Sequence, residues 1–416
     1  MRYLAPWWLP GGNVQTLWAA LYARRTAGPP PVFRRERWTA PDGDFIDVDH
    51  VAPTLPTTCG SLPPGGVTVM GPLGHPLRVV PCPPRGPLRL QPGEAGSAAP
   101  ACPGRVCADL ATSSSVIASE ARQSMAAAPA ATSSTQAPEK AGQHSPDQAG
   151  ARAPLLVVFH GLEGSSGSHY AQAFADVAAR RGWSCAVPHF RGCSGELNLA
   201  PRAYHSGDFQ EVDWILRRFA AQHAGPVVAV GVSLGGNALM RWAGEMGAQA
   251  GQVVAAVASV CAPLDLAASG QAIGKGFNRQ VYTRMFLQSM VPKALHKLTQ
   301  HPGLFSREAL LAARDLYAFD EVFTGPLHGF KGVDDYWTRA SAKPHLRNVL
   351  VPALVLNALN DPFIPAASLP RPLDVSCFVA LCQPLGGGHV GFPSGVFPGH
   401  VQAMPEAVVD FLAAQL

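Results

Sequence analysis

The chain has 416 residues, of which 47% are hydrophobic and 14% are charged, and its formal net charge is +4. This length fits either one large α/β domain with added segments or two to three average domains. A net charge this small, without a block of Lys and Arg interleaved with aromatic residues, argues against nucleic acid as a partner.

The sequence predicts no export signal, no transmembrane segment and no metal centre. Pro6 and Pro10 interrupt the apolar start of the chain, and the most apolar stretch, 253–264, is shorter than the roughly 20 residues of a spanning helix. The nine cysteines are odd in number and widely spread, which disfavours a disulfide scaffold. Cys102 and Cys107 are too far apart for the CxxC of a zinc knuckle. We therefore expect a cytoplasmic protein that uses no cofactor and no metal ion. The sequence does not indicate its oligomeric state.

The first predicted sheet element is a β-hairpin over residues 34–51, in which Asp42-Gly43 is a turn signal between two alternating segments. Residues 52–152 are then rich in Pro, Gly, Ala, Ser and Thr, with almost no aromatic residues. This composition predicts a low-complexity, disordered insertion. A short helical patch over 119–128 would bury too little surface to offset the entropy of ordering it.

From residue 154 onward short apolar runs alternate with amphipathic helices, which is typical of a parallel sheet with crossover helices. The predicted strands are rich in Val, Leu and Ala on both faces, as buried parallel strands are. They cover residues 154–160, 184–190, 226–232, 253–260, 352–359 and 375–382. The fold class is therefore α/β, with a mostly parallel central sheet flanked by helices.

Two helices that can cover this sheet are well specified. One carries apolar residues at helical spacing, and Asp208 with Glu211 predicts a capping box at its start. Its apolar positions are Phe209, Val212, Leu216, Phe219 and Ala220. The last helix is predicted to follow Pro405, with Val408, Phe411 and Leu412 on one face.

Residues 264–345 interrupt the strand rhythm with helical pieces that carry many aromatic side chains. We interpret them as a helical cap over the carboxyl edge of the sheet. The chain then divides into an N-terminal segment with the first hairpin (1–51), the insertion (52–152), a first part of the core (153–263), the cap (264–345) and a second part of the core (346–416).

The strongest local signal is Gly231-Val232-Ser233-Leu234-Gly235, a G-x-S-x-G sequence between an apolar strand and a helical run. A serine on such a tight turn needs small neighbours, and Gly231 and Gly235 supply them. The simpler interpretation is a glycine-rich strand-to-helix turn, but its position between a strand and a helix favours a nucleophile elbow. The elbow predicts an α/β-hydrolase fold with Ser233 as the nucleophile.

A serine nucleophile needs a base and an acid that orients the base, and in this fold they follow in the order Ser, Asp or Glu, His. Asp361 follows one late predicted strand, and His389, in a glycine-rich loop, follows the last one. Asp361 could also be a turn residue before Pro362, and Asp374 and Asp208 are rival acids. We predict Ser233, Asp361 and His389 as the catalytic triad.

Acyl transfer also needs hydrogen-bond donors for the oxyanion. We predict the backbone N–H groups of Leu162 and Leu234, the first in the loop after the strand that ends at His160 and the second directly after the nucleophile. His160 is expected to hold this loop rather than to take part in the chemistry. His205 is interpreted as a loop histidine. Cys193 and Cys261 lie outside an elbow context and are not nucleophile candidates, and 191–195 is interpreted first as a turn.

Several segments resemble the YheT-like branch of the α/β-hydrolases, which is related to the α/β-hydrolase-domain esterases and lipases. They are HGLEGSSGSHY, RGCSGELN, YHSGD, GVSLGGN, FDEVFTGPLHGF, NALNDPFIP and GGHVGF, with GGNVQTLW as a looser match. The resemblance implies the same triad, on Ser233, Asp361 and His389. It also implies hydrolysis of carboxylic esters, with short acyl esters or monoacylglycerol-type lipids as substrates. Residues 52–152 depart from the family pattern.

The leading hypothesis is a cofactor-free serine esterase or acylglycerol lipase that works through an acyl-enzyme and takes a small-molecule or lipid ester. One alternative is an acyltransferase that uses the same triad and passes the acyl group to an alcohol. Another is a non-catalytic binding protein on a hydrolase fold, which would be expected to lack a member of the triad. The sequence does not give the acyl chain length or the alcohol portion of the substrate.

Overall fold

The computed structural model describes residues 3–51, 67–70, 76–79 and 153–416. Strands β3 (Val67–Met70) and β4 (Pro76–Val79) pair with each other in an antiparallel two-stranded sheet of their own. The rest of the predicted insertion, including the helical patch over 119–128, lies outside the described residues.

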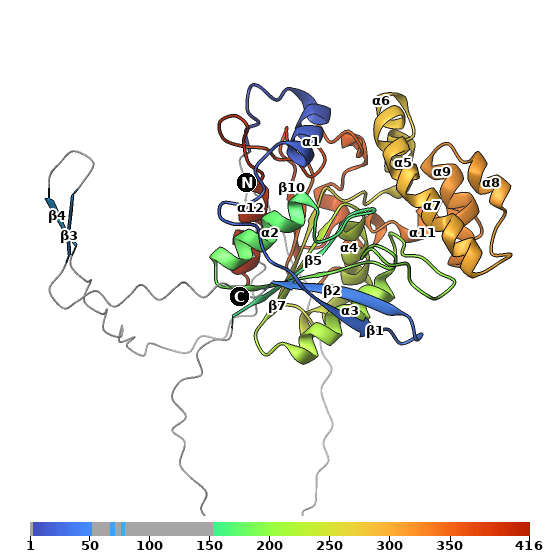
Figure 1. Cartoon of the computed structure of the whole chain (residues 1–416), viewed down its shortest axis with the longest axis horizontal. Coiled ribbons are helices and arrows are strands. Elements are labelled where there is room, and N and C mark those ends of the chain that lie inside the picture. The colour runs from blue at the N-terminus through green and yellow to red at the C-terminus, as the bar shows by residue number, and fades with distance from the viewer. Residues whose placement is uncertain (1–2, 52–66, 71–75, 80–152) are drawn as a thin grey trace, which may run out of the picture.

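The core of the fold is an eight-stranded sheet in the order β1-β2-β6-β5-β7-β8-β9-β10 (Figure 1). The predicted hairpin forms its antiparallel edge, where β1 pairs with β2 and β2 with β6, and the other neighbours are parallel. The strands are β1 (Arg34–Thr39), β2 (Phe45–Val51), β5 (Leu155–Phe159), β6 (Ser184–Pro188), β7 (Val227–Val232), β8 (Ala256–Val260), β9 (Ala353–Leu356) and β10 (Val379–Cys382).

Two strands begin later than their apolar runs suggest. The 3₁₀ helix η1 (Gly247–Gln252) precedes β8, and the Val253 N–H donates to Ala250 O, so the chain becomes extended only at Ala256. Before β10, the N–H of Ser376 donates to Leu346 O and not to β9. Apolar character marks burial, but hydrogen bonds to a neighbouring strand decide where a strand begins.

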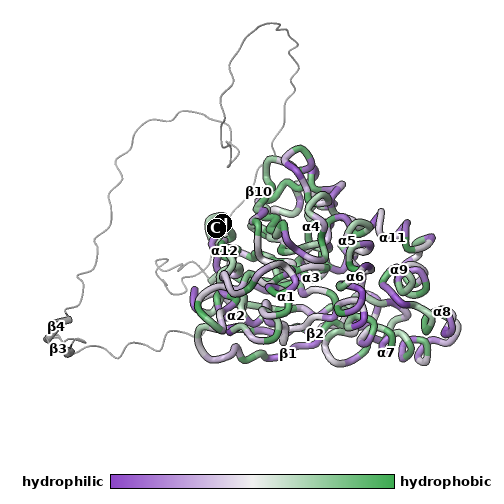
Figure 2. The backbone as a smooth tube through the Cα atoms, turned by 90° about the horizontal axis from the view of Figure 1, so that it is seen from above, coloured by the Kyte–Doolittle hydropathy of each residue, from purple (hydrophilic) through white to green (hydrophobic). Residues whose placement is uncertain are grey.

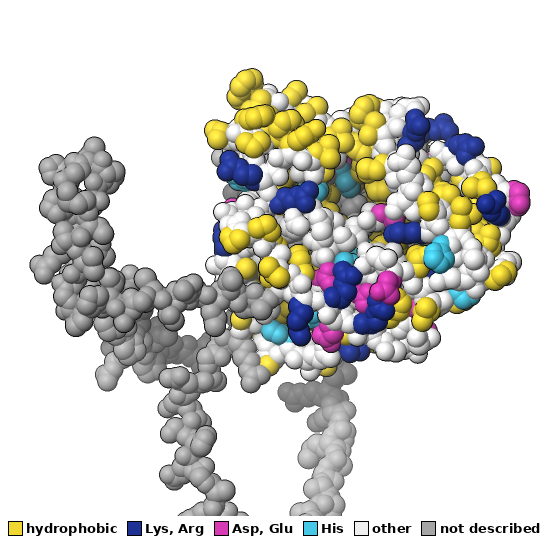
Figure 3. Space-filling model, in the orientation of Figure 1, with side chains coloured by type: hydrophobic (Ala, Val, Ile, Leu, Met, Phe, Trp, Pro, Cys, Tyr) yellow, Lys and Arg dark blue, Asp and Glu magenta, His cyan; other side chains and the backbone are white. Residues whose placement is uncertain are grey.

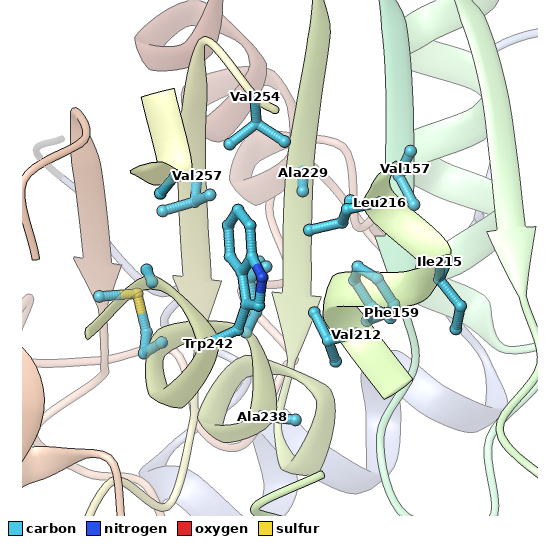
Figure 4. Packing of buried hydrophobic residues seen from close by; sticks show 14 of the residues in the cluster. Val157, Phe159, Val212, Ile215, Leu216, Ala229, Ala238, Trp242, Val254 and Val257 are labelled. Carbon is cyan, nitrogen blue, oxygen red and sulfur yellow. The ribbon is translucent and has the colours of Figure 1, made fainter. Parts of the chain in front are cut away.

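Helices cover both faces of the sheet, because alternate strand residues point to opposite sides. Helices α2 (His169–Arg180) and α12 (Ala403–Ala413) pack on one face, while α3 (Phe209–Gln222) and α4 (Leu234–Met246) pack on the other. Figure 4 shows Trp242 of α4 lying against the strands that carry Ala229 and Val257, with Leu216 of α3 nearby. The elbow between β7 and α4 therefore lies in a sheet that helices cover on both faces.

Two helix starts differ from the sequence prediction. The capping box of α3 is wrong, because the Asp208 carboxylate accepts from Arg202 and the Glu211 carboxylate from Arg191, and neither caps the helix. Helix α12 begins at Ala403, before Pro405. A proline in the first turn costs little, since the N–H groups there have no partner within the helix.

Between β8 and β9 the chain forms the helical cap, which gathers at one end of the molecule (Figures 1 and 2). Its helices are α5 (Leu266–Ile273), α6 (Gly276–Asn278), η2 (Arg279–Thr283), α7 (Arg284–Gln300), α8 (Arg307–Ala312), α9 (Leu316–Phe319), η3 (Asp320–Thr324), α10 (Gly325–Leu327) and α11 (Val333–Ala340). The short helices η4 (Lys343–Asn348), η5 (Ala366–Ser368) and η6 (Pro372–Asp374) flank β9, and α1 (Gly11–Leu21) precedes the sheet.

Candidate active site

Ser233 lies on a strained turn between β7 and α4. Its backbone has φ 54° and ψ −119°, a conformation that costs a non-glycine residue energy and is held by its surroundings. A Cβ on Gly231 would lie 2.3 Å from Gly235 O, and a Cβ on Gly235 would lie 2.5 Å from His160 O. Both predicted elbow glycines are therefore required by close backbone contacts, and the turn directs the Ser233 hydroxyl out of the sheet.

The structure brings Ser233, His389 and Asp361 into one hydrogen-bonded chain. His389 Nε2 is 2.9 Å from Ser233 Oγ, and His389 Nδ1 is 2.9 Å from Asp361 Oδ2. Because an ionised carboxylate only accepts, Nδ1 carries the ring proton and Nε2 accepts from the serine hydroxyl. The Asp361 side chain is fully buried, and its Oδ1 accepts from the Phe363 N–H at 2.8 Å. Asp361 is thus a turn residue and the partner of the histidine at once.

Helix α1 holds the loop that carries His389, which the sequence analysis did not anticipate. Thr16 Oγ1 accepts from the His389 N–H at 2.8 Å, and Gln15 Oε1 accepts from the Gly387 N–H at 2.8 Å. Gly12 lies against the turn before Asp361, where a Cβ would lie 1.8 Å from Asn360 O. The signal was present in GGNVQTLW, but nothing local in that segment names a partner so distant in the chain.

A second set of contacts also holds the loop that carries His389. Cys261 Sγ accepts from the Val390 N–H at 3.3 Å and donates to Gly388 O at 3.7 Å. Burial raises the pKa of this thiol, so it remains protonated and serves as a structural donor. His169 Nε2 lies 3.0 Å from Val390 O, and burial lowers its pKa to about 4, so the ring is neutral and donates there.

The backbone N–H groups of Leu162 and Leu234 are the predicted donors to the oxyanion. Neither has a hydrogen-bond partner in the part of the chain that the structure describes. The neighbouring N–H of Gly161 donates to Tyr170 Oη at 2.8 Å, which fixes the turn. His160 acts as expected of a structural residue, since its Nε2 accepts from the Phe190 N–H at 3.0 Å and its Nδ1 donates to Gly161 O at 2.8 Å. Burial lowers its pKa to about 3, which keeps it neutral.

Glu163 ties this turn to the cap and was not singled out from the sequence. Its N–H donates to Tyr204 Oη at 2.9 Å, and Tyr204 donates back to its Oε1 at 2.8 Å. From helix α7, Lys293 Nζ lies 2.7 Å from Oε2, and Ser289 donates to the same oxygen. The cap is therefore linked to the residue next to Leu162.

An apolar pocket opens onto Ser233 and His389 between the core and the cap. Cap side chains that form its wall include Ile273, Phe286, Phe319, Phe323 and Trp337. His205 also lines it, next to the ring of His328, and burial lowers its pKa to about 4, so it contributes a neutral ring. Several of the aromatic residues predicted for the cap thus face the pocket, although Phe277 and Tyr317 are exposed.

The rival residues lie elsewhere or are engaged. Asp374 pairs with Arg371, and Asp208 pairs with Arg202. The 191–195 segment forms a turn with positive φ at Gly192 and Gly195. Burial raises the pKa of the Cys193 thiol to about 12, so it carries no nucleophilic thiolate at neutral pH.

Within residues 3–51, 67–70, 76–79 and 153–416, every helix is too short or too polar to cross a lipid bilayer. The same ranges contain no group of three His, Cys, Asp or Glu side chains placed to hold a metal ion.

Comparison with known proteins gives the class. The family model of the alpha/beta hydrolase fold matches residues 154–396, more than half of the chain, so the protein belongs to the α/β-hydrolase family. YheT of Escherichia coli (strain K12) is 38% identical over 267 residues, which cover 63% of this chain and 77% of YheT. The chain is a YheT-like α/β-hydrolase.

Two human relatives are more distant. Phospholipase ABHD3 of Homo sapiens is 29% identical over 268 residues, which cover 63% of this chain and 64% of ABHD3. Monoacylglycerol lipase ABHD2 of Homo sapiens is 27% identical over 284 residues, which cover 62% of this chain and 65% of ABHD2. The chain thus spans slightly less than two thirds of the length of each.

Proposed function

We propose that this protein is a serine hydrolase that cleaves carboxylic esters through an acyl-enzyme. The observation that carries the proposal is the chain of two 2.9 Å hydrogen bonds from Asp361 through His389 to Ser233. A serine hydroxyl becomes a useful nucleophile only when a base takes its proton, and the carboxylate stabilises the imidazolium that results.

In the proposed reaction, Ser233 Oγ attacks the ester carbonyl carbon while His389 Nε2 takes the hydroxyl proton. The carbonyl oxygen becomes an oxyanion, which the N–H groups of Leu162 and Leu234 stabilise. The intermediate collapses, and the alcohol leaves with the proton from His389. Water, deprotonated by His389, then attacks the acyl-enzyme, and Ser233 regains its proton as the acid is released.

The apolar lining of the pocket supports a substrate with an apolar acyl chain, either a short acyl ester or a monoacylglycerol-type lipid. Ile273, Phe286 and Phe319 give this pocket an apolar wall. The relatives support the same class, because YheT carries an esterase name, ABHD3 is named a phospholipase and ABHD2 a monoacylglycerol lipase.

The test is labelling with a fluorophosphonate probe, which reacts covalently with an activated serine. We expect the wild-type protein to be labelled and Ser233→Ala to be unlabelled. Ser269→Ala is the matched control, because it removes another hydroxyl that lines the pocket and should keep the label. An unlabelled wild-type protein would contradict the proposal. Hydrolysis of p-nitrophenyl esters of increasing chain length, with and without added alcohols, then measures the acyl preference and separates hydrolysis from acyl transfer.

A further inference from the structure

Helix α1 exposes large apolar side chains, while two polar side chains are buried together with Ala19. A surface helix normally buries its apolar side chains, but here Gln15 and Thr16 are buried against the His389 loop. Val14 and Leu21 are 42% and 65% exposed, and their spacing places them on the same side of the helix. The outward side of α1 is therefore apolar.

Neighbouring segments extend this apolar surface. Phe397, 68% exposed, lies 5.5 Å from Trp18 and 5.6 Å from Trp8 between ring centroids, and Trp18 Nε1 donates to Pro398 O at 2.8 Å. Trp7, beside Trp8 in the chain, is 92% exposed. We define the apolar rim as Leu4, Trp7, Val14, Leu21, Tyr22, Val396 and Phe397, all of them exposed.

The apolar rim borders the candidate active site. Helix α1 supplies Thr16 to the His389 N–H, and Tyr282 of the cap donates to Asn13 Oδ1 of α1 at 3.1 Å. Figure 3 shows hydrophobic side chains gathered over α1 and the neighbouring C-terminal loop, beside a hollow in which a histidine is visible. The cap also exposes Phe277 and Met285.

The segments that build this surface carry basic side chains but no acidic ones. The segments that form it and face it, residues 3–33, 266–306 and 383–405, contain no Asp or Glu. They do contain cations, which include Arg24, whose backbone N–H donates to Gly399 O next to the apolar rim. The cap contributes the cations Lys275, Arg279 and Arg284. Neither these three side chains nor that of Arg24 has an ion-pair partner among the described residues.

We propose that the apolar rim docks onto the surface of an anionic lipid bilayer and so presents the mouth of the Ser233 pocket to the lipid. Exposed Trp, Tyr and Phe side chains suit the boundary between headgroups and acyl chains, and basic side chains are attracted to anionic headgroups. A second copy of the chain fits less well, because two such surfaces face to face would bring cations against cations. The docking surface goes beyond the proposed ester hydrolysis and does not depend on it.

The test is vesicle flotation of the full-length chain carrying Ser233→Ala, which prevents hydrolysis of the lipid. We expect flotation with phosphatidylcholine vesicles that contain phosphatidylserine, weaker flotation with phosphatidylcholine alone, and loss of binding at high salt. Trp7→Ser with Phe397→Ser should weaken binding at least about tenfold, since two large apolar side chains no longer enter the bilayer. Leu373→Ser is the matched control, because Leu373 is 80% exposed but lies outside the apolar rim, and it should bind as before.

A second pair of substitutions tests the charges separately. Arg279→Glu with Arg284→Glu should remove the preference for phosphatidylserine while the fold, followed by circular dichroism, is kept. Flotation that neither pair weakens would overturn the proposal, as would an absence of flotation. Sedimentation of the same proteins tests whether a second copy of the chain occupies the surface instead. A dimer that Trp7→Ser with Phe397→Ser converts to a monomer would assign the surface to a second copy. Hydrolysis of a soluble ester by the chain with Ser233 intact reports on the proposed function independently of docking.

Discussion

A close contact between two backbone segments beside the nucleophile gives the sharpest prediction. Gly235 lies where α4 meets the end of β5, and a Cβ there would be 2.5 Å from His160 O and 2.6 Å from Phe159 O. Ordinary contacts of a Cβ begin at 3.4 Å, so Gly235→Ala requires a displacement of about 0.9 Å between two backbone segments. Neither segment can avoid the contact by rotating a side chain.

This displacement acts directly on the proposed oxyanion donors. Leu234 belongs to the segment that starts α4, and Leu162 follows the end of β5, so separating the two segments moves the two N–H groups apart. A misplacement of about 1 Å costs catalysis about 10²-fold, and loss of one oxyanion donor costs about 10²- to 10³-fold. We expect kcat/KM of Gly235→Ala to fall about 10²-fold. Overpacking should lower the free energy of unfolding by about 1–3 kcal/mol.

The assay is hydrolysis of p-nitrophenyl acetate together with urea unfolding, which separates lost catalysis from lost folded protein. Gly251→Ala is the control, because a Cβ on Gly251 would have no other atom within 4 Å, so this variant should keep both activity and stability. A folded Gly235→Ala variant with kcat/KM within about threefold of the wild type would refute the reasoning, since the two segments would then be shown to tolerate the displacement.

Two further predictions concern Thr16 and Asp320. Thr16→Val leaves the His389 N–H without an acceptor, so we expect the free energy of unfolding to fall by about 1–3 kcal/mol and kcat/KM to fall as well. Thr16→Ser keeps the hydroxyl and should behave as the wild type. An equal loss in both variants would contradict this role of the hydroxyl. Burial raises the pKa of Asp320 to about 6, so its folded form binds the proton more tightly than its unfolded form and stability falls as pH rises from about 4 to 6. Between pH 4 and pH 7.5, the free energy of unfolding of Asp320→Asn, measured in urea, should therefore rise by up to about 3 kcal/mol relative to that of the wild type. If the difference in unfolding free energy between the two proteins does not vary with pH, Asp320 does not carry a destabilising buried charge.

Much of the fold could be predicted because its signals are local. The parallel strands are buried on both faces, so each is a continuous apolar run, and the hairpin is marked by Asp42-Gly43. The limits of β8 and β10 were less accurate because they depend on which neighbour takes the hydrogen bonds. The capping box failed for a related reason, since arginines outside the helix take the carboxylates of Asp208 and Glu211.

The sequence by itself determined which residues are candidates for the chemistry: the steric needs of the elbow mark Ser233, and chain order marks Asp361 and His389. Tertiary structure alone decided what holds them in place. Thr16 Oγ1 accepts a hydrogen bond from the His389 N–H, 373 residues away in the sequence, and Glu163 joins the turn beside Leu162 to Lys293 of the cap. Spacing along the chain records the period of an element and the shape of a turn, but contacts between distant segments arise only when the elements pack, so no local pattern records them.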